Sequence, residues 1–119
     1  MTSGESFPKS EHLVKTGDFR RAYKDGTSLR KDWLVLYRLA NGTARNRIGF
    51  SVSARCIKLA NGRNRIKRLL RESYRRNKKC IKKGFDIVLV VKKKPPETIK
   101  YEDTRSIFLQ LADKAGLLI

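Results

Sequence analysis

Apolar residues near the start of the chain recur with the period of a helix. Phe19 and Tyr23 lie four positions apart in the stretch TGDFRRAYKDG, so a helix would place both on one face. Thr16 or Asp18 could cap the free N–H groups at the start of this helix. Gly26 could close it in the left-handed conformation. The pattern predicts a short helix that ends at Gly26.

Two stretches with strand character follow. Residues 33–39 (WLVLYRL) are aromatic and β-branched enough to predict a strand, which residues 26–32 could extend. A turn at residues 41–43 (NGT) leads to a second strand over residues 47–53 (RIGFSVS), expected to run antiparallel to the first. In that strand two sets alternate, Ile48, Phe50 and Val52 on one face and Gly49, Ser51 and Ser53 on the other. The small residues either leave space above the sheet or simply face solvent.

A helical period returns over residues 61–83. At ~100° per residue its apolar positions form one stripe. The members of the stripe are Ile66, Leu69, Leu70, Tyr74, Cys80 and Ile81. The remaining surface carries Lys67, Arg68, Arg71, Arg75, Lys78 and Lys79. Such a helix would dock through its stripe, leave its charges outward and end at Gly84.

The last third of the chain predicts a strand and a helix. Residues 85–91 (FDIVLVV) form an almost unbroken apolar run, typical of a central strand covered on both faces. The run KKKPP stops this strand, and Thr98 or Asp103 could begin a final helix. The apolar face of that helix would hold Ile107, Leu111 and Ala115, with Phe108 and Leu118 beside it.

The order helix, strand, strand, helix, strand, helix predicts an α+β fold in which helices pack on a small mixed sheet. A chain of 119 residues has the size of one domain, so residues 1–119 are interpreted as a single domain. Residues 1–12 are expected to be loosely ordered, because Gly4 and Pro8 lie among polar residues. No run approaches the ~20 apolar residues of a membrane span, and none resembles a secretory signal, which favours a cytoplasmic protein.

The net charge points to a polyanionic partner. Lys and Arg number 29 against 11 Asp and Glu, a formal charge of +18 that destabilises a compact monomer by self-repulsion. Residues 61–83 hold eleven Lys or Arg and one Glu, so 11 − 1 = +10 of this charge lies on one predicted helix. A solvated charged face is the simpler explanation where acidic residues are interspersed, but here only Glu72 is. Nucleic acid is therefore the favoured partner, ahead of an anionic membrane surface.

Groups for catalysis or metal binding are scarce. His12 is the only histidine, and with Cys56 and Cys80 it falls short of the four ligands of a structural zinc site. The two cysteines are interpreted as thiols in a reducing cytosol rather than as a disulfide. Glu72 lies among arginines and is expected to be an ion-pair partner, not a base. No carboxylate cluster or Walker-type loop is present, so the protein itself is not expected to carry catalytic groups.

Several motifs together resemble one family. RNRIKRLLRESYR is preceded by SVSAR and followed by FDIVLVVKK, while GDFRRAY and LVLY match near the start; together they cover roughly residues 13–118. In this respect the chain resembles the protein subunit of bacterial ribonuclease P. The resemblance implies a left-handed βαβ crossover, against the usual right-handed rule. It also implies a catalytic RNA as partner, with one protein per RNA.

The resemblance further implies a function. The ribonucleoprotein is an endoribonuclease that removes the 5′ leader of precursor tRNA, and the RNA with Mg²⁺, bound mainly by that RNA, performs the chemistry. The protein would assist by binding the RNA and the leader. Positions matching the motif that faces the catalytic RNA are Arg63, Asn64, Arg65, Lys67, Arg68 and Arg71. Positions matching the leader cleft are Phe19, Tyr23, Tyr37, Ser51, Ser53, Arg55, Lys92 and Lys93.

The chain also departs from the family pattern and leaves alternatives open. Ala54-Arg55 stand where the family often has two lysines, and Asn61-Gly62 precede the basic motif where apolar residues are usual, which leaves the start of the basic helix open. From the residues alone, Phe19 and Tyr23 are either core residues or stacking platforms for unpaired bases. A ribosomal or other structural RNA-binding protein would share the charge and fold, and a protein-only nuclease is the enzymatic alternative.

Overall fold

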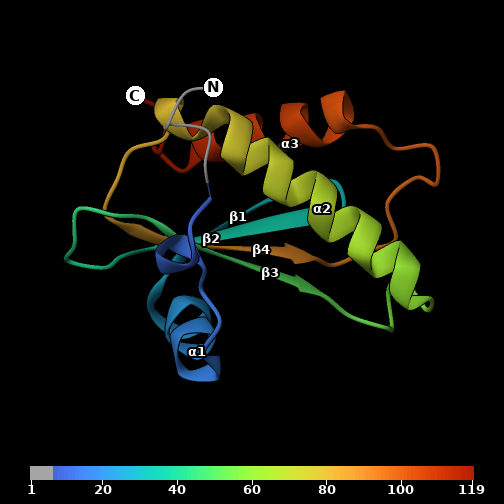
Figure 1. Ribbon diagram of the computed structural model, residues 1–119, viewed down its shortest axis with the longest axis horizontal. Coiled ribbons are helices and arrows are strands. Elements are labelled where there is room, and N and C mark those ends of the chain that lie inside the picture. The colour runs from blue at the N-terminus through green and yellow to red at the C-terminus, as the bar shows by residue number, and fades with distance from the viewer. Residues whose placement is uncertain (1–6) are drawn as a thin grey trace.

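The computed structural model describes residues 7–119 as a four-stranded sheet with helices on both faces (Figure 1). The helices are α1 (Thr16–Asp25), α2 (Ala60–Asn77) and α3 (Tyr101–Lys114), with short 3₁₀ turns η2 (Lys9–Glu11) and η3 (Lys78–Cys80). The strands are β1 (Thr27–Lys31), β2 (Leu34–Ala40), β3 (Arg47–Val52) and β4 (Phe85–Val91). Helices α2 and α3 cover one face of the sheet and α1 lies on the other. This is the predicted α+β class with a mixed sheet.

The strand order is β1-β2-β4-β3. The strands predicted at residues 33–39 and 47–53, which are β2 and β3, do run antiparallel as expected, but they are not neighbours. Strand β4 lies between them, antiparallel to β2 and parallel to β3. The turn after β2 therefore closes no hairpin, and α2 is the crossover that links two parallel neighbours. The physical reason is the composition of β4: its apolar run, interrupted only by Asp86, gains most from a central position, where both of its faces are buried.

Strand β1 is separate from β2 and does not extend it, so the fold has one strand more than the predicted order of elements. It pairs antiparallel with β2 through a two-residue loop, Asp32-Trp33, in which Asp32 has a φ of 54°. Two-residue hairpin loops need such positive φ values to match the strand twist. Trp33 consequently lies in the loop and is buried at 5% exposure. The sequence did not predict β1 as a strand of its own, because an edge strand with polar, exposed residues lacks an apolar pattern.

The sheet separates two apolar clusters of unequal size. The smaller one lies on the α1 side and holds Leu13, Ala22, Val35, Val88 and Val90. The larger one joins the sheet to α2 and α3, and its fully buried members include Leu34, Ile48, Leu70, Ile87, Leu89, Phe108 and Leu111. Alternate residues of β4 thus enter opposite clusters, which confirms the prediction of a central strand covered on both faces.

Helix α1 begins at the predicted Thr16, but its ends are formed differently from the expectation. Its N-cap is Lys15, so neither Thr16 nor Asp18 occupies the capping position. Gly26 has a φ of −80° and not a left-handed conformation. Glycine is required there for space: a Cβ atom would lie 2.4 Å from the carbonyl oxygen of Ala22 and 2.8 Å from that of Arg38.

Helix α2 ends six residues before the predicted boundary. It stops at Asn77, and residues 78–80 form a 3₁₀ turn, so Cys80 is exposed while Ile81 is buried by a bridge to Leu118. Gly84, with a φ of 98°, ends the connection to β4. In α3, Asp103 is the third helical residue, and its carboxylate accepts the N–H of Lys100 at 3.0 Å. The final helix thus starts between the two predicted residues.

The segment before α1 packs along the edge of the sheet. Phe7 stacks on His12 with ring centroids 4.0 Å apart, and the N–H of Leu13 donates to the carbonyl of Ile48 at 2.8 Å. Of the segment 1–12 expected to be loosely ordered, residues 1–6 lie outside the described residues. Over residues 7–119, no helix has the length and apolar character needed to cross a membrane.

Candidate nucleic-acid interface

A hollow of about 480 Å³ opens between α1 and the carboxyl ends of β3 and β4. We call it the sheet cleft. Its walls are Tyr23, Tyr37, Ser51, Ser53, Arg55, Cys56, Val90, Val91 and Lys92. Six of these nine had been predicted as leader-binding residues; Cys56, Val90 and Val91 had not. The two valines gave no functional signal in the sequence, because they belong to the apolar run of a central strand.

Two tyrosines form one side of the sheet cleft. The rings of Tyr23 and Tyr37 meet edge to face, with centroids 4.9 Å apart and planes at 67°. Tyr23 is 41% exposed, so part of its ring is open to a ligand. Burial raises the pKa of Tyr23, and a hydrogen bond with Ser51 acts in the opposite direction. The phenol therefore stays protonated at neutral pH and retains an O–H donor beside the hydroxyl of Ser51.

Small residues of β3 create the space on this side of the sheet. A Cβ atom at Gly49 would lie 2.6 Å from the ring of Phe19, so this ring rests directly on the strand backbone. Phe19 is half-buried against the smaller apolar cluster, and its ring centroid lies 6.3 Å from that of Tyr23. Neither Phe19 nor Lys93 lines the sheet cleft. Of the two aromatic residues on α1, only Tyr23 contributes to the wall of the cleft, whereas Phe19 packs against β3 at Gly49.

The basic motif lies in the first half of α2. The whole helix carries seven Lys or Arg and one Glu, so 7 − 1 = +6. Asn64, Arg65 and Arg68 are exposed, whereas Lys67 is half-buried. The helix begins at Ala60, so Asn61 and Gly62 lie inside it. This answers where the basic helix starts, which the sequence had left open. The structure thus brings the predicted RNA-binding residues onto one helix, next to the loop that ends the sheet cleft.

Two arginines of this motif also hold neighbouring loops. The guanidinium of Arg63 donates to the carbonyls of Ile57 and Lys58, both at 2.8 Å. The guanidinium of Arg65 donates to the carbonyl of Ile99, 34 residues further along the chain. A guanidinium has five N–H donors, so each arginine keeps further donors for a phosphate. The sequence does not predict these contacts, because helical periodicity shows only which charges lie away from the apolar stripe.

Further along α2 the charges take part in packing. The guanidinium carbon of Arg71 lies 5.7 Å from the ring centroid of Phe50, and its Nε is buried without a hydrogen-bond partner within residues 7–119. Glu72 forms ion pairs with Arg75 at 2.6 Å and with Arg76 at 3.3 Å. The hydrogen bond from Arg75 lowers the pKa of Glu72, which keeps it ionised at neutral pH. The predicted role of Glu72 as an ion-pair partner is confirmed.

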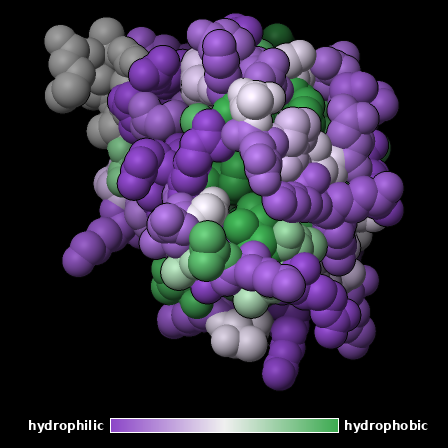
Figure 2. Space-filling model, turned by 90° about the vertical axis from the view of Figure 1, so that its right-hand side faces the viewer, coloured by the Kyte–Doolittle hydropathy of each residue, from purple (hydrophilic) through white to green (hydrophobic). Residues whose placement is uncertain are grey.

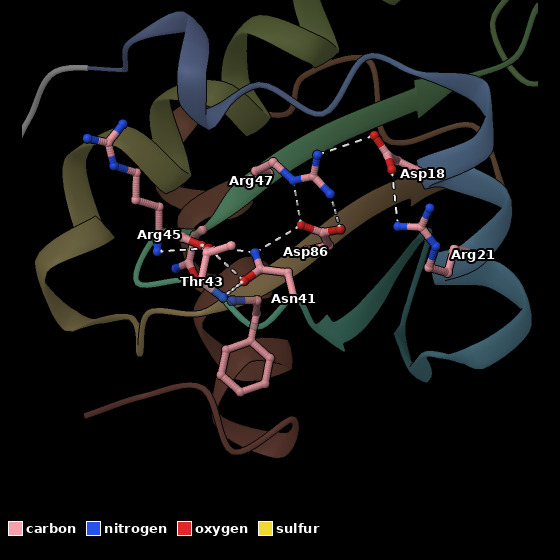
Figure 3. Close-up of polar contacts among 9 residues, drawn as sticks. Asp18, Arg21, Asn41, Thr43, Arg45, Arg47 and Asp86 are labelled. Atoms are coloured by element: carbon pink, nitrogen blue, oxygen red, sulfur yellow. Dashed lines mark hydrogen bonds and ion pairs between the residues drawn. The ribbon is translucent and has the colours of Figure 1, made fainter.

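A charge network joins α1 to the sheet (Figure 3). Arg47 donates twice to the carboxylate of Asp86, at 2.9 and 2.7 Å, and its Nη1 lies 3.3 Å from Asp18. Asn41 also donates to Asp86, at 3.0 Å, and Arg21 pairs with Asp18 at 3.2 Å. The hydrogen bond with Asp86 raises the pKa of Arg47. The network was missed because its members are up to 68 positions apart in the sequence, as 86 − 18 = 68.

Other candidate groups remain dispersed over residues 7–119. Cys56 is half-buried and Cys80 is exposed, and both are free thiols. No three His, Cys, Asp or Glu side chains gather in this part of the chain. Tyr74, whose hydroxyl is buried against the N-terminal segment, has its pKa raised to about 12 by burial.

A small, strongly basic α+β fold with an open cationic cleft defines a protein of the nucleic-acid-binding class. Comparison with known proteins gives the particular family. The family model described as Ribonuclease P matches residues 7–116. The chain belongs to the ribonuclease P protein family, and it is a protein component of the bacterial type.

Individual relatives agree over most of the chain. The ribonuclease P protein component of Alkaliphilus oremlandii is 40% identical over 106 residues, which cover 89% of this chain and 91% of the relative. The solved ribonuclease P protein of Thermotoga maritima has a TM-score of 0.80 at 36% identity, over 87% of this chain and 96% of that one. The protein from Staphylococcus aureus has a TM-score of 0.82 at 28% identity, over 93% and 100%. Ribonuclease P, RNA binding and tRNA processing follow from membership in this family.

Proposed function

We propose that this protein holds the 5′ leader of precursor tRNA in the sheet cleft and the catalytic RNA of ribonuclease P on α2. One protein would act with one RNA, in the cytoplasm. The observation that carries the proposal is the meeting of Tyr23, Tyr37, Ser51, Ser53, Arg55 and Lys92 around one cavity, although they come from separate elements. Aromatic faces, hydroxyls and cations are the groups that bind an unpaired RNA strand.

Each wall of the sheet cleft has a chemical part in this proposal. The exposed portion of the Tyr23 ring offers a face on which a base stacks. The hydroxyls of Ser51 and Ser53 offer hydrogen bonds to base edges or to ribose. Arg55 and Lys92 neutralise phosphates at the end of the cleft where β3 and β4 stop. Binding of this kind tolerates many sequences, which suits a leader that differs between tRNA precursors.

Helix α2 supplies the second surface. Arg63, Asn64, Arg65 and Arg68 come from its first half, where the N–H groups of the first turn add partial positive charge. Guanidinium groups match phosphate oxygens in a bidentate manner. Because α2 follows directly on the loop that ends the sheet cleft, the two surfaces would hold leader and catalytic RNA side by side.

Hydrolysis belongs to the RNA in this proposal. Mg²⁺, bound mainly by the RNA, supplies the metal-ion chemistry of phosphodiester cleavage. The side chains of the protein provide binding energy and positioning, and they neutralise phosphate charge that would otherwise demand more Mg²⁺. Their contribution to the rate is therefore largest at low Mg²⁺ concentration.

Cleavage of precursor tRNA at low Mg²⁺ tests the proposal. Three reactions are compared: catalytic RNA alone, this protein alone, and both together. We expect cleavage at the leader junction only with RNA present, and a clear gain when the protein is added. Activity of the protein alone would replace the proposal with a protein-only nuclease. No gain from adding the protein would indicate a structural RNA-binding role.

A further inference from the structure

A second cavity, of about 520 Å³, lies at the start of α2. It is enclosed by the loop from Arg55 to Leu59, the first turns of α2 and residues 94–97. We call it the Pro95 pocket. Figure 2 shows this side of the molecule, where apolar side chains gather in a hollow surrounded by hydrophilic ones. The volume lies within the about 300–1,000 Å³ of typical ligand sites.

The walls of the Pro95 pocket are held in place by contacts described above. Arg63 fixes the carbonyls of Ile57 and Lys58 on one side, and Arg65 fixes the carbonyl of Ile99 behind the other. At Gly62 an added Cβ atom would lie 2.8 Å from the side chain of Ile57, so the loop packs tightly on the helix. The pocket is therefore already formed in the free protein and needs little reorganisation to bind.

The pocket combines an apolar interior with a cationic rim. Ile57, Leu59, Ile66 and Pro95 supply apolar surface, and Leu59 is 70% exposed. The rim carries Arg55, Lys58, Arg65 and Lys94, against one acid, Glu97, which pairs with Lys94 at 3.3 Å. An unstacked nucleotide has the complementary chemistry, since its base has flat faces for apolar contact and its phosphates are anionic.

The position of the pocket indicates which strand would supply that nucleotide. Arg55 and Cys56 line both the Pro95 pocket and the sheet cleft, so the two cavities share a wall. A strand that leaves the sheet cleft across this wall reaches the pocket without a break in cationic surface. The catalytic RNA would instead approach from the outer face of α2. The continuity favours the strand that occupies the sheet cleft.

We propose that the Pro95 pocket accepts one unstacked base of the precursor leader as that strand leaves the sheet cleft. The inference rests on the proposed function, because it assigns the leader to the cleft. It adds a base-binding site on the far side of the wall formed by Arg55 and Cys56, and Arg55 is the one residue of this pocket that also matches the leader cleft of the family.

The variant Leu59→Ser tests the pocket without weakening the fold. Leu59 is the N-cap residue of α2, and serine is among the preferred N-cap residues, so the helix start is kept or improved. The change removes apolar wall and alters no charge. Ile119→Ser is the matched control, because Ile119 is 84% exposed and lies at the other end of the molecule (Figure 1). Thermal unfolding of both variants establishes that they are folded.

The measurement is the affinity of the assembled holoenzyme for precursor tRNA and for tRNA without a leader. We expect Leu59→Ser to weaken precursor binding about tenfold, within the range for loss of one stacked base. Binding of leaderless tRNA and of the catalytic RNA should stay unchanged, as should every value for Ile119→Ser. Precursors with a single abasic leader nucleotide then locate the base: one position should matter in the wild type and not in Leu59→Ser.

Other outcomes overturn the inference in recognisable ways. Unchanged precursor binding by a folded Leu59→Ser variant would mean that the pocket holds no leader base. Weaker assembly with the catalytic RNA, at equal preference for precursor, would assign the pocket to that RNA instead. If the wild-type holoenzyme itself did not distinguish precursor from leaderless tRNA, the proposed function would fail first, and no variant would be needed to see it.

Discussion

Gly49 determines how closely α1 approaches the sheet. The ring of Phe19 lies only 2.6 Å from the position that the β-carbon of any other residue would take, and the same ring packs against the smaller apolar cluster. The position of Tyr23, one turn further along α1, follows from that contact. One missing methyl group thus sets both the packing of the helix and the shape of the sheet cleft.

Gly49→Ala is therefore expected to destabilise the protein by about 1–3 kcal/mol, the usual cost of overpacking a core. Its Cβ atom would meet the ring of Phe19 at 2.6 Å. The control is Gly17→Ala, where an added Cβ atom meets nothing within 4 Å and a helical position gains up to about 1 kcal/mol. Urea unfolding of both variants gives the values, and equal effects of the two changes would contradict this account of Gly49.

Tyr23 should affect ligand binding more than stability, because 41% of it is exposed. Tyr23→Ala removes a stacking face, so we expect a holoenzyme with about tenfold weaker binding of precursor tRNA and unchanged binding of leaderless tRNA. Tyr23→Phe keeps the face and should retain most of the affinity. Should Tyr23→Ala unfold the protein at room temperature, Tyr23 would be a core residue and not part of a binding surface.

At the scale of elements, α2 packs through one side and carries most of its charge on the other. Ile66, Leu70 and Tyr74 are buried against the larger cluster, while its cations point outward or tie down loops. An amphipathic period makes this division possible, because residues three and four apart share a face. Folding therefore leaves the charges on the open side in contact with solvent, where the proposed function places the catalytic RNA.

Removing one exposed charge from α2 tests that division. Arg68→Gln should weaken binding of the catalytic RNA and reduce the magnitude of the log–log salt slope by about 0.7–0.9, as for one phosphate contact. Lys114→Gln removes the same charge from an exposed position of α3 and should leave the slope unchanged. Filter binding over a series of salt concentrations measures both. Equal slopes for the two variants would mean that only total charge matters.

The attachment of α1 to the sheet depends on the buried carboxylate of Asp86. Its side chain is 2% exposed and receives two hydrogen bonds from Arg47, which is 33% exposed. Arg47→Ala should cost about 3 kcal/mol, because it leaves a buried charge without its cation. Arg21→Ala breaks only the outer pair to Asp18, at a 55% exposed arginine, and should cost about 0.5 kcal/mol or less. Denaturant midpoints compare the two; similar losses would argue against a special role of Asp86.

At the scale of the whole molecule, the most important physical property is the net charge. A charge of +18 lies within 36 × 35 × 26 Å, and α2 alone carries seven Lys or Arg. Successive turns of a helix are about 5.4 Å apart, which is less than the Debye length of ~8 Å at physiological salt. The mutual repulsion of these cations opposes folding, and phosphates relieve it by replacing repulsion with attraction. Binding of RNA and stability of the protein are therefore expected to rise together.

Affinity for the catalytic RNA should consequently fall steeply with salt. Contact with roughly six phosphates predicts a log–log slope near −4 to −5, at about 0.7–0.9 per phosphate. Titrations between low and physiological salt measure it, with magnesium held constant. A flat response would exclude an interface made of phosphate contacts, whatever the affinity at one salt concentration.

The sequence by itself determined the helices, most of the strands, the cationic helix and the family. These features depend on neighbouring residues: the period of α2, the apolar run of β4 and the motif RNRIKRLLRE are each contained in one short stretch. Local pattern also indicated the small face of β3, where Gly49 and Ser51 alternate with apolar residues. It could not separate β1 from β2, because the polar edge strand has no apolar period.

Tertiary structure alone decided the strand order, the charge network and the Pro95 pocket. Strand β4 enters between β2 and β3 because burial of both its faces outweighs pairing of strands that are close in sequence. Asp18 meets Arg47, and Arg65 meets Ile99, only after α1 and the loop before α3 have packed against distant elements. Contacts of this kind arise from the whole arrangement, and their free energy is not encoded in any one segment.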